Sequence, residues 1–447
     1  MLTTTSISTF VPTTTPLPGF PRFCLKWPLS EDSVHESVQN EKVLAKAVDT
    51  KAFNKGWVFP KRPILFIADA HADADAFYAS LLATGGIEIT GKKRKPLRLT
   101  HFGRSAVFVI GGDCLDKGPS NLQLLRAVKQ LIDTGARVKI LAGNHDLRLL
   151  MGILVIGEKR ETGSEHMFVR MGRKVIPLLA EVFDEYLRAS KWEKGIPDEK
   201  ECRRRLFPAD DWFEAFPSVA ISSITPEGIA RELKKMRSKV QKFEEYCEES
   251  GLTMRQVYAV ALKCKSLFLS EKGEFGWFFH SMQLAYKKGS FLFVHAGLDD
   301  QTCQDIAENG IAQMNKRFHQ QLSQNLFGFY YSSLANTFRT KYRLADKPLT
   351  SAGVNSVKAA GIYALVRGHV SHLQGQKLSI REGLLHIEGD VTLDRNSRHK
   401  GGAVGIGYGV TVIEPAGFVV AISADYPYAK VFNPKHYSLK NHASTHH

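Results

Sequence analysis

Short motifs along the chain contain side chains that can bind a metal ion. They combine carboxylates, imidazoles and one amide, and no cysteine sulfur is among the candidate ligand atoms. Such a mixed nitrogen and oxygen set suits Mn, Fe, Zn or another borderline divalent cation. A carboxylate shared by two ions also allows a metal pair about 4 Å apart, which can clamp the attacking and leaving oxygens of an ester hydrolysis. In chain order, the candidate ligands are Asp69, His71, Asp113, Asn144, His295 and His369.

The candidate ligands follow short apolar runs that predict buried strands. Runs of this kind, bounded by glycine and turn residues, are typical of strands buried in a sheet. Between the first of them, residues 73–82 and 121–134 have helical patterns, and this alternation indicates a sheet with helices on both faces. Ligand-binding residues in such sheets lie just past the C-terminal ends of the strands. The predicted strands are Pro63–Ala68, Ser105–Ile110, Val138–Ala142, Phe291–Val294 and Tyr363–Val366.

Two later regions complete the predicted organisation. Residues 151–286 break the alternation and are typical of a mainly helical insertion or cap, with Thr225 and Pro226 starting one helix and a second helix over 253–269. From Lys377 onward, four short strands indicate a second sheet that closes the fold. The expected segments are an N-terminal extension, partly disordered, over 1–60, core over 61–150, the insertion, core over 287–430, and a C-terminal tail over 431–447.

Five motifs hold the candidate ligands in one order. They are Asp69-Ala70-His71, Gly112-Asp113-Cys114-Leu115-Asp116-Lys117-Gly118, Gly143-Asn144-His145-Asp146, His295-Ala296-Gly297-Leu298 and Arg367-Gly368-His369. The set resembles the calcineurin-like metallophosphoesterase superfamily. The second, fourth and fifth motifs most resemble its Ser/Thr protein-phosphatase-type branch and the bacterial relatives of that branch. The resemblance implies an α/β (α+β) fold, in which a two-sheet β-sandwich core is flanked by helices and carries a large helical insertion.

The resemblance also implies how two divalent metal ions, Mn, Fe, Zn or a mixed pair, would be held. Asp113 would bridge them, with Asp69 and His71 on the first ion. The second ion would be bound by Asp113 together with the remaining three ligands. A hydroxide bridging the metals would then attack phosphorus. These ions meet the need of phosphoryl transfer for charge neutralisation and an aligned nucleophile.

Three further residues take catalytic roles by the same resemblance. His145 would protonate the leaving oxygen, Asp116 would orient His145, and Lys117 would contact the phosphate, where protein phosphatases often carry Arg. A proton is needed because an alkoxide is a poor leaving group. The candidate substrate-binding residues are Lys117, Arg148, Arg367 and Arg398.

Departures from the family pattern leave the substrate branch open. Ala68 and Ala72 replace the glycines that usually flank the first motif, which requires a backbone without positive φ at both positions. Asp146 stands where protein phosphatases carry Glu. Ser371 occupies the slot in which the superfamily commonly has a second histidine, and His372 lies one residue further on, with its site role left open.

These features predict a phosphoric ester hydrolase, a dinuclear metallophosphoesterase acting on phosphate monoesters. Phosphoserine and phosphothreonine are candidate substrates, so the partner is a phosphorylated protein, a small molecule or a nucleotide. The alternative is a nucleotide or dinucleoside-polyphosphate hydrolase or a phosphodiesterase. A non-catalytic scaffold of the same fold is disfavoured, because every expected ligand and His145 are present.

Composition gives expectations about the partners of the protein and about its compartment. The 447 residues carry a net charge of +15, which favours anionic partners as a field effect, and nucleic acid is not specifically indicated. The six cysteines form no CxxC pair, which argues against a zinc-thiolate site or a disulfide scaffold and favours a reducing compartment. No apolar run is long enough to span a membrane. A cytoplasmic location is the default expectation, with a floppy tail over residues 1–30 or, as the alternative, a targeting role for them.

Overall fold

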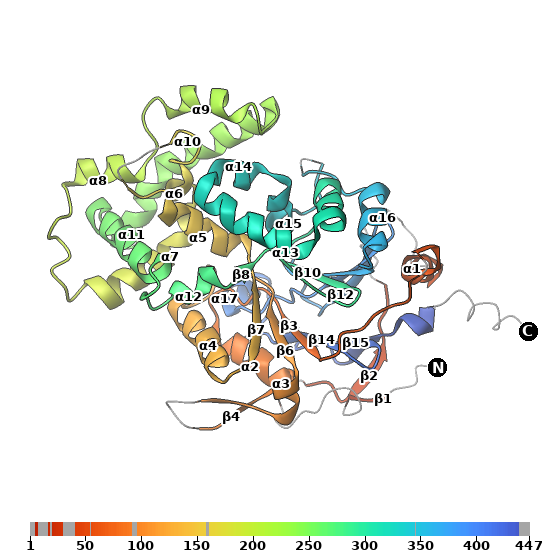
Figure 1. Cartoon of the computed structure of the whole chain (residues 1–447). Coiled ribbons are helices and arrows are strands. Elements are labelled where there is room, and N and C mark those ends of the chain that lie inside the picture. The colour runs from red at the N-terminus through yellow and green to blue at the C-terminus, as the bar shows by residue number, and fades with distance from the viewer. Residues whose placement is uncertain are drawn as a thin grey trace, which may run out of the picture.

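Two β-sheets packed face to face form the core of the molecule (Figure 1). The structure, a computed structural model, describes residues 5–7, 17, 20–29, 41–53, 55–91, 96–157, 161–344 and 346–437. The basic run at 92–95 lies outside these residues. The two-sheet α/β (α+β) architecture flanked by helices is confirmed. A sheet with helices on both faces is not observed, because one face of each sheet contacts the other sheet.

Nine strands form the larger sheet. In spatial order they are β1 (Thr5–Ser6), β2 (Phe23–Lys26), β16 (Ala429–Phe432), β15 (Phe418–Ser423), β14 (Gly409–Glu414), β3 (Ile64–Ile67), β6 (Val107–Ile110), β7 (Arg137–Leu141) and β8 (Met282–Gln283). β3, β6 and β7 run parallel, whereas β14 is antiparallel to β3. β2 pairs with β16, so residues 23–26 belong to the sheet rather than to a tail.

Five strands form the smaller sheet. In spatial order they are β12 (Lys377–Arg381), β13 (Leu384–Glu388), β11 (Ala364–Arg367), β10 (Phe291–Val294) and β9 (Ala285–Lys288). β10, β11 and β13 run parallel. The expectation that all four late strands close one second sheet is wrong. Only β12 and β13 join this sheet, while β14 pairs with the free edge of β3 and carries β15 with it.

The alternation of side chains along the strands builds the core between the sheets. Phe66 on β3 faces Phe293 on β10, with ring centroids 5.8 Å apart. Val366 and Ile387 of the smaller sheet are completely buried in the same cluster. Successive side chains of a strand point to opposite faces of the sheet. Leu65 and the other side chains that point away from the second sheet therefore face the helices. Hydrophobic burial on both faces therefore fixes the register of the strands that end at the candidate ligands.

Helices cover the outer faces of the sandwich, and a short hairpin of β4 (Ile87–Ile89) and β5 (Leu97–Leu99) lies at one edge. Outside the insertion they are α1 (Glu41–Val48), α2 (Ala74–Ala83), α3 (His101–Ser105), α4 (Asn121–Asp133), α5 (Asn144–Leu154), α13 (Asp300–Gln324), α14 (Leu326–Tyr331), α15 (Asn336–Arg339), α16 (Ser351–Ala359) and α17 (Arg395–Lys400). Figure 1 shows α2 and α4 on one side of the sheets and α13 and α16 on the other. The Asp73 and Ser120 side chains cap α2 and α4, which begin directly after two ligand motifs.

The segment between α5 and β8 is helical, as predicted. Its helices are α6 (Met167–Arg170), α7 (Ile176–Val182), α8 (Glu199–Leu206), α9 (Trp212–Ala220), α10 (Pro226–Glu249), α11 (Met254–Leu269) and α12 (Gly276–His280). The Thr225 side chain accepts from the Gly228 N–H at the start of α10, which confirms the predicted cap with Pro226 at the first helical position. Figure 1 shows α8 to α11 gathered at one end of the molecule, beyond the edge of the sheets.

A buried ion pair joins two helices of the insertion. Both nitrogens Nε and Nη2 of Arg170 on α6 donate to the carboxylate of Glu232 on α10. The Arg170 guanidinium also lies 4.3 Å from the ring centroid of Tyr330. Burial would raise the pKa of Glu232, but Arg170 lowers it to about 2. The ionised carboxylate therefore contributes stability above its unfolded pKa, and this contribution is lost as pH falls towards the folded value.

Replacing this carboxylate is expected to destabilise the insertion in a pH-dependent way. Glu232→Gln leaves Arg170 buried without its counter-charge, which costs about 3–5 kcal/mol. The gap from wild type stays constant down to about pH 4.5 and narrows below it, because Glu232 of the unfolded wild-type chain then takes up a proton while the folded carboxylate is still ionised, which lowers wild-type stability. Urea unfolding at several pH values measures this gap. Glu245→Gln, an exposed change on the same helix, is the matched control, and equal losses in the two variants would contradict the prediction.

Two further features of the described residues concern the cysteines and the helices. All six cysteines are buried and free. None of the helices within the described ranges combines the length and apolar character that crossing a membrane requires.

Candidate metal centre

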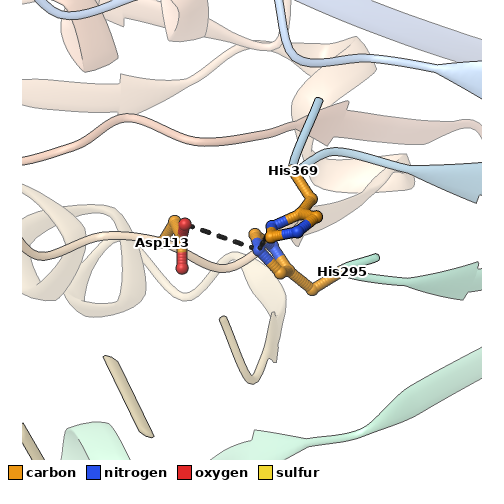
Figure 2. Close-up of side chains that lie close together, drawn as sticks. All are labelled: Asp113, His295 and His369. Carbon is orange, nitrogen blue, oxygen red and sulfur yellow. Dashed lines mark hydrogen bonds and ion pairs between the residues drawn. The ribbon is translucent and has the colours of Figure 1, made fainter. Parts of the chain in front are cut away.

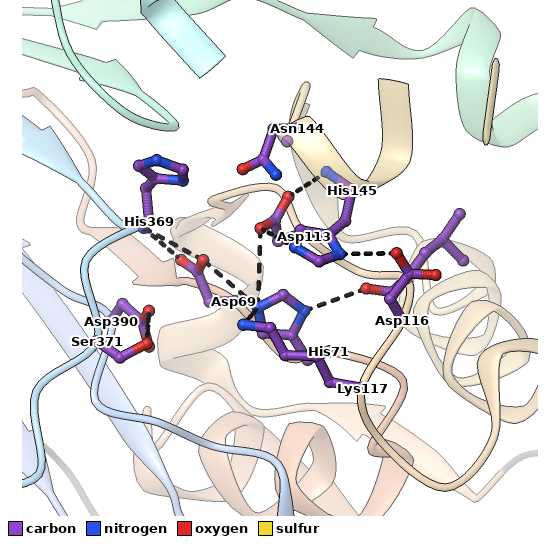
Figure 3. Close-up of polar contacts among 12 residues, drawn as sticks. Asp69, His71, Asp113, Asp116, Lys117, Asn144, His145, His369, Ser371 and Asp390 are labelled. Atoms are coloured by element: carbon purple, nitrogen blue, oxygen red, sulfur yellow. Dashed lines mark hydrogen bonds and ion pairs between the residues drawn. The ribbon is translucent and has the colours of Figure 1, made fainter. Parts of the chain in front are cut away.

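The candidate ligands meet at one end of the sandwich, where strands of both sheets finish (Figure 3). Asp69 follows β3 and Asp113 follows β6 in the larger sheet. Asn144 begins α5, directly after β7 and the turn at Ala142 and Gly143. His295 follows β10 and His369 follows β11 in the smaller sheet. The parallel strands thus deliver side chains far apart in sequence to one edge.

One group of ligands consists of Asp69, His71 and Asp113. Nε2 of His71 lies 4.0 Å from Oδ1 of Asp69 and 3.7 Å from Oδ2 of Asp113. The other ring nitrogen, Nδ1, donates to the carbonyl of Leu115 at 3.1 Å, which leaves a lone pair on Nε2 towards the carboxylates. All three side chains are almost completely buried.

A second group shares Asp113 and adds His295 and His369 (Figure 2). Nδ1 of His295 donates to the carbonyl of Gly111 at 2.8 Å, so the neutral ring, the form that binds a metal ion, has its lone pair on Nε2. This nitrogen faces Oδ1 of Asn144 at 3.2 Å, Nδ1 of His369 at 3.2 Å and Oδ2 of Asp113 at 3.5 Å.

The donor chemistry of both groups fits divalent cations. In each group the ligand atoms lie within 4.8 Å of one another. Carboxylate oxygens and imidazole nitrogens converge in each group, and this mixed oxygen and nitrogen set is one that borderline divalent cations accept. Within the part of the chain that the structure describes, Nε2 of His369 is also buried without a hydrogen-bond partner.

Charge is concentrated among these ligands. Burial and the nearby Asp390 raise the pKa of Asp69 well above its ordinary value. Burial opposes ionisation of Asp113 as well, but His295 and His145 lower its pKa well below the usual range. Burial would lower the pKa of His295, yet Asp113 and Asp69 raise it to about 10. Positive charge is therefore strongly favoured at the position that these carboxylates surround.

The backbone of the motifs is strained. The described ranges contain ten non-glycine residues with positive φ, and seven of them lie in or beside the ligand motifs. Each costs about 1–2 kcal/mol, and such strain gathers at functional sites. The expectation that Ala72 avoids positive φ is wrong, because its φ is 54°. Asp69 and His71, with φ of 55° and 41°, are not extended either, so a turn rather than strand alternation brings them together.

His145 lies beside the ligands and is held by Asp116. Nδ1 of His145 donates to Oδ2 of Asp116 at 2.7 Å. Its Nε2 lies 3.9 Å from Oδ2 of Asp113, on the side of the candidate metal centre. Burial raises the pKa of Asp116 to about 7. A hydrogen bond from Nδ1 fixes the ring orientation and aims Nε2 at the centre.

Two of the candidate substrate-binding residues reach this region. Nζ of Lys117 lies 2.6 Å from Nε2 of His71. Arg148 on α5 extends towards Asp116, with Nη1 3.5 Å from Oδ2, rather than lying on an outer helix face. Both cations therefore stand next to the ligand groups, as Figure 3 shows for Lys117.

The other two candidates are engaged in buried ion pairs. Arg367 donates to Glu388 at 2.7 Å, and the same carboxylate binds Nε2 of His372 at 2.7 Å. Arg398 forms a bidentate ion pair with Asp425, in which Nη1 donates to Oδ2 at 2.6 Å and Nη2 donates to Oδ1 at 2.8 Å. The structure thus places these side chains in the packing around the centre and does not bring them to the ligands.

Two acidic residues shape the site in ways that spacing did not reveal. Asp146 accepts from the backbone N–H groups of Cys114, Leu115 and Gly143, at 2.9, 3.1 and 3.2 Å, and so ties the second motif to the third. Asp390 accepts from the Ser371 hydroxyl at 2.8 Å and lies near Asp69 (Figure 3). In the sequence, the only sign of Asp146 was that it stands where protein phosphatases carry Glu. The only sign of Asp390 was its position after β13.

A small cavity of about 170 Å³ adjoins the second ligand group. Asn144 and His369 line one part of it, and basic side chains line much of the rest. Its cations include three residues of the run Arg339-Thr340-Lys341-Tyr342-Arg343, which sequence reasoning did not single out. The density of basic residues in that run was the available signal.

A family model matches part of this chain. Residues 62–233 match the family model for calcineurin-like phosphoesterase. This match confirms the resemblance indicated by the motifs and supports a metal-dependent phosphoesterase hydrolase. It spans the first three motifs and part of the insertion, while His295 and His369 lie beyond it. None of the curated proteins matches the chain significantly.

Several solved structures are similar to this chain. A cold-active protein tyrosine phosphatase from a psychrophilic Shewanella species is 13% identical, with a TM-score of 0.43 over 84% of this chain and 83% of that one. A protein serine/threonine phosphatase from Saccharomyces cerevisiae is 11% identical, with a TM-score of 0.37 over 88% and 90% of the two chains. A metallophosphoesterase from Sphaerobacter thermophilus is 12% identical, with a TM-score of 0.28 over 83% and 88%.

Proposed function

We propose that the protein is a dinuclear metal-dependent phosphatase that hydrolyses phosphate monoesters, with phosphoserine and phosphothreonine among its candidate substrates. The observation that carries this proposal is the pair of ligand groups sharing Asp113, with His145 held beside them by Asp116. The family match supports the phosphoesterase class, and the motifs at Asp113–Gly118 and Arg367–His369, which resemble the protein-phosphatase-type branch, favour a monoesterase within it.

The ligand groups define which residues would hold each ion. Asp69, His71 and Asp113 would hold one, and Asp113 with Asn144 and the two later histidines would hold the other. When bound, such a pair of ions supplies Lewis acidity, neutralises phosphoryl oxygens and activates water as a nucleophile. The hydrogen bonds from His71 to Leu115 and from His295 to Gly111 fix the tautomers that metal binding needs.

The neighbouring residues would bind the phosphate and move the proton. His145 donates through Nδ1 to Asp116, and the protonated imidazole can then give its Nε2 proton to the leaving oxygen. Asp116 would stabilise the positive charge that this acid carries. Lys117 and Arg148 would place positive charge beside the phosphoryl oxygens.

Hydrolysis of para-nitrophenyl phosphate and of its bis ester by metal-stripped protein tests the proposal. Mn, Fe, Zn, Mg, Ni and Co are added back singly, and bound metal is measured by elemental analysis. We expect metal-dependent turnover with a preference for the monoester. A preference for the bis ester would instead identify a phosphodiesterase. Bound metal without turnover of either ester would contradict a catalytic role and favour the scaffold.

A further inference from the structure

The cavity beside the second ligand group is strongly cationic. It is lined by Arg148, Arg170, Arg339, Lys341 and Arg343, and its one acidic lining residue is Asp346. Helices α5, α6, α14 and α15, together with the loop that follows α15, supply the lining, so both the insertion and the core contribute. Because Asn144 and His369 also line it, a group bound there would lie directly beside the candidate metals.

Within the described part of the chain, the acidic residue of the cavity forms no ion pair with these cations and is bound to the backbone instead. Oδ2 of Asp346 accepts from the backbone N–H groups of Lys341 and Arg343, at 2.9 and 3.0 Å, and from the Thr340 hydroxyl at 3.1 Å. This carboxylate therefore folds the loop that carries the two basic side chains. Neither the Lys341 ammonium nor the Arg343 guanidinium has an ion-pair partner among the described residues.

Two arginines of the cavity are held in place by other groups. Tyr330 lies between them, with its ring centroid 4.3 Å from the Arg170 guanidinium and 4.5 Å from that of Arg339. Glu232 binds Arg170 on the side of the insertion. Such stacking and pairing reduce the rotamer freedom of an arginine, so less entropy is lost when it binds an anion.

We propose that this cavity binds a second phosphoryl group of the substrate, a few bonds away from the phosphoryl group that is hydrolysed. The inference rests on the proposed function and extends it to a substrate class, namely compounds with two neighbouring phosphoryl groups. The planar guanidinium of an arginine can donate two parallel hydrogen bonds to the oxygens of a phosphoryl group. Several cations together balance the double negative charge of that group.

The size of the cavity suits a small anionic group. Its volume of about 170 Å³ is well below the roughly 300 Å³ at which pockets for drug-sized ligands start. A phosphoryl group therefore matches the cavity better than a nucleoside does.

Calorimetric titration of the metal-loaded His145→Asn protein tests this inference, because the substrate should bind this protein without being consumed. The probes are propane-1,3-diol bisphosphate and the corresponding monophosphate. We expect the bisphosphate to bind at least about tenfold more tightly, given the usual strength of charge-assisted hydrogen bonds. Adding Lys341→Gln and Arg343→Gln to the same protein should reduce this ratio to about two, the statistical advantage of two equivalent groups. Both side chains are exposed, so their loss should not prevent folding.

Lys288→Gln is the matched control for charge. Lys288 pairs with Phe291 at the end of β10 that is remote from His295, and this variant should keep the full ratio. Equal affinities in the parent protein, an unchanged ratio in the double variant, or an equal loss in the Lys288 variant would each overturn the inference. A protein that binds the bisphosphate as expected but hydrolyses no monoester would refute the proposed function and leave the binding site established.

Discussion

The Asp113→Asn protein is expected to bind less than two equivalents of metal and to lose roughly 1000-fold in kcat/KM for a phosphate monoester, since metal ions supply several kcal/mol of transition-state stabilisation. Asp113 is the one residue common to both ligand groups, with Oδ2 3.7 Å from His71 and 3.5 Å from His295. The amide keeps the size of the side chain but removes its charge and one acceptor oxygen. Elemental analysis and steady-state kinetics measure the two effects on one preparation.

Asp133→Asn is the matched control for this change. Asp133 lies at the exposed end of α4 and pairs with Lys129, so the same substitution there should alter neither metal content nor turnover. Two equivalents of metal with wild-type turnover in Asp113→Asn would contradict the bridging role.

The second large effect is expected from His145→Asn, which should retain its metal but lose activity by about 10²–10⁴-fold. His145 belongs to neither ligand group, and its Nδ1 is bound to Asp116. The variant therefore separates proton transfer from metal binding. The loss should be larger for an alkyl phosphate than for para-nitrophenyl phosphate, because nitrophenolate leaves readily without a proton.

His436→Asn provides the comparison for a histidine without a role in the site, since His436 is exposed near the C-terminal end of the described chain. It should behave as wild type with both esters. Equal losses on the two esters in His145→Asn would argue against a proton donor and for a role in orienting substrate. Loss of metal in that variant would instead place His145 among the ligands.

Local sequence signals predicted much of this structure. The strands before Asp69 and Asp113 were recognisable from buried apolar runs ending in polar residues, and the start of α10 from Thr225 and Pro226. These are properties of a few neighbouring residues. The packing of two sheets face to face followed from the family resemblance, whereas the local strand–helix alternation predicted helices on both faces of a sheet.

Other features depend on contacts that no local pattern contains. β14 has the composition of any buried strand, and only the free edge of β3 decides which sheet it joins. The loop of Lys341 and Arg343 reaches the cavity because α14, α15 and Asp346 direct it there. Arg398 is bound by Asp425, which lies 27 positions further along the chain, and the residues next to Arg398 in the sequence give no sign of this contact.

The ligands of the candidate metal centre come from both sheets, and Asp69 and His369 are 300 positions apart in the chain. During synthesis, the ribosome releases the strands before Asp69, Asp113 and Asn144 first, and then the whole helical insertion. His295 and His369 emerge only afterwards, so a nascent chain cannot complete the second ligand group until the whole insertion and the strand before His369 have been made. A metal ion in the second ligand group would then join an early and a late part of the core. The occupancy of that second ion, unlike that of the first, would therefore also measure the fraction of molecules whose two sheets have docked correctly.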